Sequence, residues 1–178
     1  MAPSLNESLV AGDSAAFAAL YDRLAGRLLS TARMMTASPA DAEDILHDVF
    51  VELARHRCRL AAVSDLDAYV FTMLRHAVIR RQRRAAIDRR VVAEMHRRRG
   101  PGGLSCTTPA TMPDDQLQTA VAALPPAQRE VVALKFYGGL TFAEIAAAMG
   151  TSLNTAASRY RYALEKLRSL MQPKDGEP

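Results

Sequence analysis

Arginine is the residue type that clusters most strongly in this chain. Residues 75–99 hold ten arginines against Asp88 and Glu94, a local net charge of +8 in a chain of net charge +4, so the remainder sums to −4. Guanidinium groups bind phosphate oxygens, and a basic block in an otherwise acidic protein is typical of nucleic-acid binding. The alternative is a solvated, arginine-rich helix end.

Groups that could perform catalysis or bind a metal show no useful pattern. The chain has no glycine-rich phosphate loop and no nucleophile–base pair, and its histidines and cysteines lack paired ligand spacing. These residues are His47, His56, His76, His96, Cys58 and Cys106. We therefore expect no metal, no cofactor and no enzymatic activity.

The stretch from Thr141 to Leu167 has the pattern of a helix-turn-helix. Thr141 and Glu144 form a capping box, Gly150 supplies a left-handed turn residue, and Ser152 caps a second helix. The early turns of that second helix would read the major groove of DNA. The expected reading residues are Ser152, Asn154, Thr155, Ser158, Arg159, Arg161 and Tyr162. The alternative is a helical hairpin used only for packing.

Helical periodicity elsewhere predicts an all-α protein of two small domains. Three helices are expected after Asp13, after Ser38-Pro39 with an acid at the third position, and after Ser64 with Asp67. Six of the sixteen residues in 100–115 are Gly or Pro, which predicts a linker that could span at most about 50 Å. The predicted units are a domain at 1–99, the linker at 100–115, a domain at 116–173 and a tail at 174–178.

Two further surfaces could bind partners. Asp44, Asp48 and Glu52 recur every four residues and predict an acidic stripe opposite the apolar stripe of their helix, suited to a basic helical partner. Tyr69 and Phe71, just before the arginines, would suit unstacked single-stranded bases. An ordinary solvated face is the alternative for the acids, and core packing is the alternative for either aromatic ring.

The chain lacks an apolar run of about 20 residues and an export signal, and its two cysteines are far apart. We expect a cytoplasmic protein without a membrane partner and without a disulfide.

Both predicted domains together resemble the sigma-70 family of bacterial RNA polymerase, in particular its extracytoplasmic-function (ECF) group. The stretch LPPAQREVVALKFYGGLTFAEIAAAMGTSLNTAASRYRYAL is similar to region 4, which reads the −35 promoter element. The stretches GDSAAFAALYDRLAGRLL and SPADAEDILHDVFVELARH resemble region 2. The resemblance covers roughly residues 11–90 and 117–171.

The resemblance implies partners and residue roles. Core RNA polymerase would bind through the clamp coiled coil of its largest subunit, its flap region would bind region 4, and promoter DNA and an anti-sigma factor would be further partners. The implied polymerase-binding residues are Asp41, Asp44, Asp48, Val51 and Glu52. The implied −10 residues are Tyr69, Phe71, Arg75, His76, Arg80, Arg83 and Arg84.

The chain also departs from the family pattern. The −10 helix commonly carries Trp, Asn and Asp where this chain has Tyr69, His76 and Arg80, and the reading helix commonly carries basic residues where it has Ala157 and Tyr162. Because both domains resemble the family despite these departures, a promoter-specificity subunit is the leading hypothesis. The alternatives are a sigma mimic that titrates an anti-sigma factor and a helix-turn-helix regulator that never joins polymerase.

Overall fold

Helices make up all the regular structure of the residues that the computed structural model describes, which are 4–36, 38–99 and 115–171. Their order is α1 (Leu5–Ala11), α2 (Ser14–Met35), α3 (Pro39–Arg55), the 3₁₀ helix η1 (Arg57–Ala62), α4 (Leu66–Arg99), α5 (Asp115–Ala122), α6 (Pro126–Phe136), α7 (Phe142–Met149) and α8 (Leu153–Met171). The predicted all-α class and the two helical units are confirmed. The predicted linker and tail fall almost entirely outside the described residues, and the domain limits remain a prediction.

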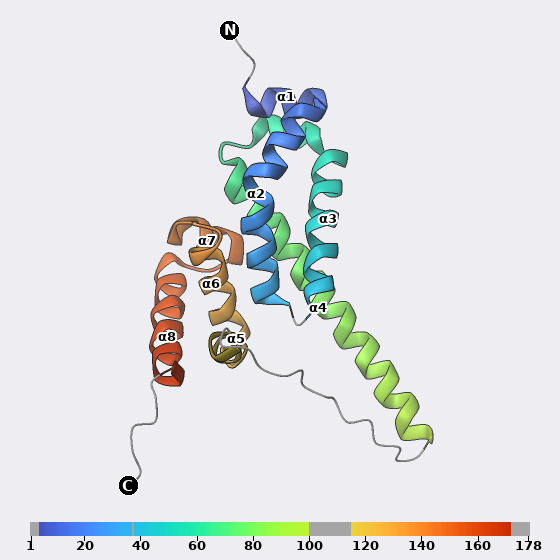
Figure 1. The fold of residues 1–178 in the computed structure, drawn as a ribbon, viewed down its shortest axis with the longest axis vertical. Helices are drawn as coiled ribbons and strands as arrows, with labels where there is room; N and C mark the ends of the chain where they lie inside the picture. The colour runs from blue at the N-terminus through green and yellow to red at the C-terminus, as the bar shows by residue number, and fades with distance from the viewer. Residues whose placement is uncertain (1–3, 37, 100–114, 172–178) are drawn as a thin grey trace.

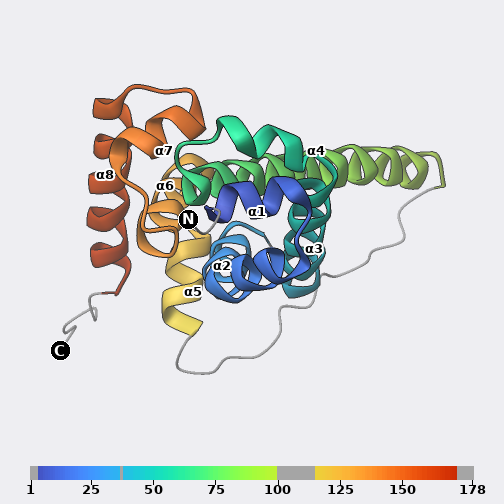
Figure 2. The same cartoon turned by 90° about the horizontal axis from the view of Figure 1, so that it is seen from above.

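The N-terminal unit is a bundle of α2, α3 and α4, with α1 and η1 packed together at one end (Figure 1). Its interior is filled by leucines that recur every four residues along α2, namely Leu20, Leu24 and Leu28. Beyond this bundle α4 continues as a projecting arm, and residues 81–90 are all exposed (Figures 1 and 2). Residues 81–90 of the arginine-rich block therefore lie on a part of α4 that the core does not cover.

Two helix starts differ from the sequence-based expectation. Asp65, and not Ser64, caps α4, because its Oδ1 accepts a hydrogen bond from the Ala68 amide at 2.9 Å. Ser38 occupies the N-cap position of α3 with Pro39 following, as predicted, but its side chain makes no capping hydrogen bond. Because Pro39 has no N–H, the first turn of α3 has one donor fewer to satisfy.

Sequence reasoning missed α1, although its signal was present. Ser4 and Glu7 form a reciprocal capping box at its start, and hydrogen bonds from Ser4 lower the pKa of the Glu7 carboxyl from its ordinary value. Leu9 of this helix is fully buried. A helix of seven residues with one buried residue offers too little periodicity to stand out in the sequence.

The C-terminal unit packs against the N-terminal unit through one continuous core. α6 packs against α2, α7 packs against α4, and buried residues of α6 and α7 join the same apolar cluster as those of α2 and α4. Figure 1 shows α6 and α7 beside α2, with α8 on the outer side of α6. Val131, Leu134 and Ile145 are fully buried there. Because burying one such side chain stabilises by about 1.5–3 kcal/mol, this packing holds the two units together.

Candidate nucleic-acid and polymerase interfaces

The predicted local geometry of the helix-turn-helix, formed by α7 and α8, is confirmed. Thr141 and Glu144 form the reciprocal capping box of α7, Gly150 ends that helix with φ +61°, and the Ser152 hydroxyl accepts from the Thr155 amide at 3.1 Å. Ala146 of α7 is buried. The rings of Phe142 and Tyr160 meet edge to face, 5.5 Å between centroids, and hold α8 against α7.

One face of α8 packs inward and the opposite face is available to a ligand. Ala156, Ala163 and Leu167 are buried at helical spacing. At 100° per residue, Asn154, Ser158 and Arg161 project from the other side. Of these, Asn154 and Arg161 are exposed and Ser158 is half-buried. These three side chains therefore form the candidate reading face.

The other predicted reading residues lie at the edges of this face. Thr155 is half-buried and its hydroxyl lies 2.8 Å from that of the capping Ser152, so both hydroxyls are already used locally. Arg159 is half-buried, whereas Tyr162 is exposed with the Arg161 guanidinium 5.1 Å from its ring centroid. Arg161 also lies 4.0 Å from Glu165 one turn later. These weak, exposed contacts leave Arg161 free to exchange them for DNA.

Phe71 does not belong to the DNA surface. Its ring is fully buried in the core, and the Arg27 guanidinium lies 5.1 Å from the ring centroid. Stacking on a base would require the ring to leave the core, so the expectation for this residue is corrected and core packing is its role. Tyr69 is half-buried and packs against the same core. The pattern of aromatics before arginines could not separate these roles, because helix rotation decides which ring points inward.

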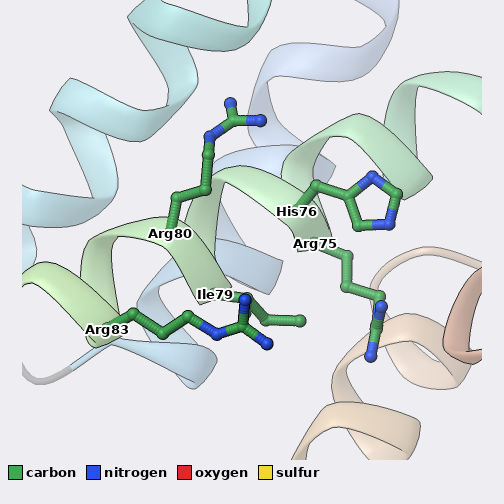
Figure 3. Close-up of a pocket in the computed structure, with 5 residues that line it drawn as sticks. All are labelled: Arg75, His76, Ile79, Arg80 and Arg83. Carbon is green, nitrogen blue, oxygen red and sulfur yellow. The ribbon is translucent and has the colours of Figure 1, made fainter.

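The basic residues of α4 surround an open hollow of about 420 Å³. It is lined by Arg75, His76, Ile79, Arg80 and Arg83 (Figure 3). His76, Arg80 and Arg83 are exposed, as is Arg84 on the same arm. The two exposed guanidinium groups, of Arg80 and Arg83, and the imidazole of His76 beside one hollow suit the phosphates of a nucleic acid.

Arg75 lies on that helix but is bonded to the C-terminal unit. Its Nε donates to Glu130 Oε1 of α6, and its Nη1 donates to the Ala148 carbonyl of α7 at 3.0 Å. The side chains of Arg75 and Glu130 are only 15% and 13% exposed. In this arrangement Arg75 is therefore an interdomain residue, which corrects the expectation that it faces DNA directly.

Arg27 makes a second connection between the units, which sequence reasoning missed. Its Nε donates to the Tyr137 carbonyl at 3.2 Å and its Nη2 donates to the Gly138 carbonyl, while Nη1 pairs with Asp67 at 3.1 Å. Gly138 is buried, and a Cβ there would collide with the Leu134 carbonyl oxygen. Arg27 and Arg75 thus satisfy carbonyls at the C-terminal ends of α6 and α7, where positive charge is favoured.

The acidic stripe of α3 is exposed at Asp44 and Asp48, on the side of the helix away from its buried residues, and it borders α4. Arg81 pairs with Asp41 and, at 3.4 Å, with Asp44, while Arg80 pairs with Glu52 at 2.9 Å. Asp41 raises the pKa of the Arg81 guanidinium by accepting its hydrogen bond. Asp48, the remaining stripe residue, is exposed, and the neighbouring Val51 is half-buried.

Other predicted features can be checked only where the structure describes them. Among the described residues, no group of three His, Cys, Asp or Glu is placed to hold a metal ion. No described helix is long and apolar enough to cross a membrane. Cys58 is exposed and free, while Cys106 and the side chain of His96 lie outside the described residues.

The fold, the helix-turn-helix and the arginine-lined surface of α4 define a two-domain helical protein. The chain matches the family model for sigma-70 region 2 over residues 20–87 and the model for sigma-70 region 4 over residues 114–167. It is 29% identical to the ECF RNA polymerase sigma factors SigL and SigK of Mycobacterium tuberculosis H37Rv, covering 91% of this chain and 92% and 89% of theirs.

Solved structures show the same fold. The sigma factor RpoE of Bartonella quintana, in complex with the anti-sigma factor NepR, superposes with a TM-score of 0.71 at 20% identity over 89% of this chain and 98% of that one. CnrH, in complex with the cytosolic domain of CnrY, superposes with a TM-score of 0.66 at 23% identity over 94% of both chains.

These matches, in the order predicted from the motifs, identify the chain as a member of the sigma-70 family, in its ECF group. It is a sigma factor, and the prediction of a promoter-specificity subunit is confirmed at this level.

Proposed function

We propose that this sigma factor recruits core RNA polymerase through α3, reads duplex DNA through α8 and holds melted DNA on the basic face of α4. The observation that carries the proposal is the combination, in one chain, of an exposed reading face on α8 with an arginine-lined hollow on α4. It would act by binding alone, with no catalytic group and no cofactor of its own, in the cytoplasm where polymerase works.

The residue assignments follow from exposure and charge. For the −35 element we propose Asn154, Ser158 and Arg161, with Arg159 and Tyr162 at the edges of the face. For the −10 element we propose the exposed groups His76, Arg80, Arg83 and Arg84, supported by Tyr69. For polymerase we propose the α3 surface that includes Asp41, Asp44, Asp48, Val51 and Glu52, with the clamp coiled coil of the largest subunit as the partner.

Promoter binding requires the two units to separate. α4 and α7 pack together here, whereas promoter sites two DNA turns apart lie roughly 70 Å from each other. A free chain with this packing cannot contact both sites. Polymerase would stabilise the open form, and an anti-sigma factor is a further proposed partner because RpoE, which shares this fold, is bound to the anti-sigma factor NepR.

Transcription with purified core polymerase tests the proposal. The chain is added to core enzyme with a library of randomised upstream sequences, and transcript starts are sequenced. We expect starts at a fixed distance from two shared sequence blocks. A sigma mimic or a regulator that never joins polymerase would yield no transcript above core enzyme alone, and that result would refute the function.

A further inference from the structure

Arg75 lies where its guanidinium could bind either the C-terminal unit or DNA. It lies on α4 among the residues that line the hollow, next to His76 and one turn before Ile79 and Arg80. Figure 3 shows its side chain pointing away from the hollow's other cations, toward the C-terminal unit. The residue that would extend the basic face of α4 is therefore turned to an interdomain contact.

The groups that bind Arg75 are chemically similar to a phosphate. Glu130 provides a carboxylate oxygen and Ala148 provides a carbonyl at the end of α7, where the helix dipole adds negative charge. Guanidinium groups bind carboxylates and phosphates through the same paired N–H donors. A phosphate of single-stranded DNA would satisfy the same donors, and the neighbouring cations would remain available to the adjacent phosphates.

The ion pair of Arg75 and Glu130 is also largely buried, so its loss should affect the packing of the two units. Both side chains are more than four-fifths shielded from solvent, unlike the exposed pairs made by Arg80 and Arg81. Removing one partner of a buried pair leaves an uncompensated charge, which disfavours that conformation strongly. Loss of the Glu130 charge should therefore weaken the docking of the C-terminal unit on α4 without altering α4 itself.

From this geometry we infer that Glu130 stands in for a DNA phosphate at Arg75, so that docking of the C-terminal unit and capture of single-stranded DNA by α4 compete for one guanidinium. The inference rests on the proposed function of α4. The apparent affinity of the free chain for DNA is then the intrinsic affinity multiplied by the fraction of molecules in which Arg75 is not bound to Glu130. DNA that gains Arg75 opens the two units, and separation of the units raises DNA affinity.

Fluorescence anisotropy with the full chain and a labelled single-stranded oligonucleotide tests this competition. We expect Glu130→Gln to bind the oligonucleotide at least about threefold more tightly than the unchanged chain, because more molecules offer Arg75. Glu43→Gln is the matched control, since it removes the same charge from an exposed pair with Arg33 within the N-terminal unit. It should change affinity much less. An excess of inorganic phosphate should not displace the oligonucleotide, because binding to α4 requires several adjacent phosphates.

The decisive comparison is made in a second background. In Arg75→Ala, adding Glu130→Gln should give no further gain, since the shared guanidinium is gone. Small-angle X-ray scattering on the same proteins should show a larger radius of gyration for Glu130→Gln. Equal gains in both backgrounds, or expansion without tighter binding, would overturn the competition. The transcription assay with the unchanged chain is independent: product there together with no gain from Glu130→Gln would refute this inference and leave the sigma function standing.

Discussion

Arg80 of α4 donates from Nη2 to Oε2 of Glu52 on α3 across 2.9 Å. This pair joins the proposed DNA-binding surface to the proposed polymerase-binding surface, and Arg81 repeats the connection with Asp41 and Asp44. Both arginine side chains remain about half exposed, so these pairs are weak and exchangeable. Binding of polymerase to the acids would release the arginines for DNA, and binding of DNA would release the acids.

Charge reversal on α3 should weaken polymerase binding. We expect the double variant Asp44→Lys, Asp48→Lys to lose most of its core enzyme in a pull-down, because both side chains are exposed on the acidic stripe. Glu43→Lys, on the same helix outside the stripe, is the control and should retain binding. The circular dichroism spectra of the double variant and of Glu43→Lys should match that of the unchanged chain. Retained binding by the double variant would remove this stripe from the interface.

Phe71 should contribute to stability and not to DNA binding. Truncation of a fully buried phenylalanine costs about 3–5 kcal/mol, so Phe71→Ala should lower the free energy of unfolding in urea by that amount. Tyr162→Ala removes a ring that is 51% exposed and should change the free energy of unfolding by less than about 0.5 kcal/mol. A stable Phe71→Ala protein that fails to open promoters would show instead that the ring contacts DNA.

The reading face of α8 predicts the effect of single arginine changes. Arg161→Ala should weaken binding of the full chain to duplex −35 DNA by about 1–3 kcal/mol if the guanidinium reads a base, and the loss should depend on sequence. A phosphate contact would instead weaken all sequences alike and reduce the salt dependence. Arg168→Ala, on the last turn of α8, is the control. Equal affinities for Arg161→Ala and the unchanged chain would place the reading face elsewhere.

Two glycine substitutions should have opposite effects on stability. Gly150 ends α7 at φ +61°, a conformation that L side chains disfavour, so Gly150→Ala should destabilise by about 1–2 kcal/mol despite open space around it. Gly26 lies within α2, where a Cβ would meet nothing within 4 Å, so Gly26→Ala should stabilise by about 0.5–1 kcal/mol. Urea denaturation measures both, and a stabilising Gly150→Ala would contradict the turn geometry.

Promoter discrimination should rest mainly on the −35 element. Arginine and histidine at positions 80 and 76 favour sequence-independent phosphate contacts, whereas base choice needs particular donors and acceptors. Single-base changes across both elements, scored by run-off transcription, should therefore reduce transcript more at −35 than at −10. Equally sharp losses at −10 would make His76 and Arg80 base-reading residues.

The sequence by itself determined the features that depend on near neighbours. The capping box of Thr141 and Glu144, the left-handed turn at Gly150 and the cap at Ser152 involve residues within a few positions of one another, so their types predict their geometry. The same holds for the all-α class, because helical periodicity and caps are local. The motif order also sufficed to identify the family.

Only the tertiary structure decided which side chains are free to act. Phe71 and Tyr69 are two residues apart, yet the rotation of α4 against α2 buries one ring fully and the other partly. Arg75 and Glu130 are 55 positions apart, and no local pattern could pair them. Their contact exists because buried apolar residues of α2, α4, α6 and α7 join in one core. Long-range packing, which depends on the shape of whole surfaces, therefore placed these charges.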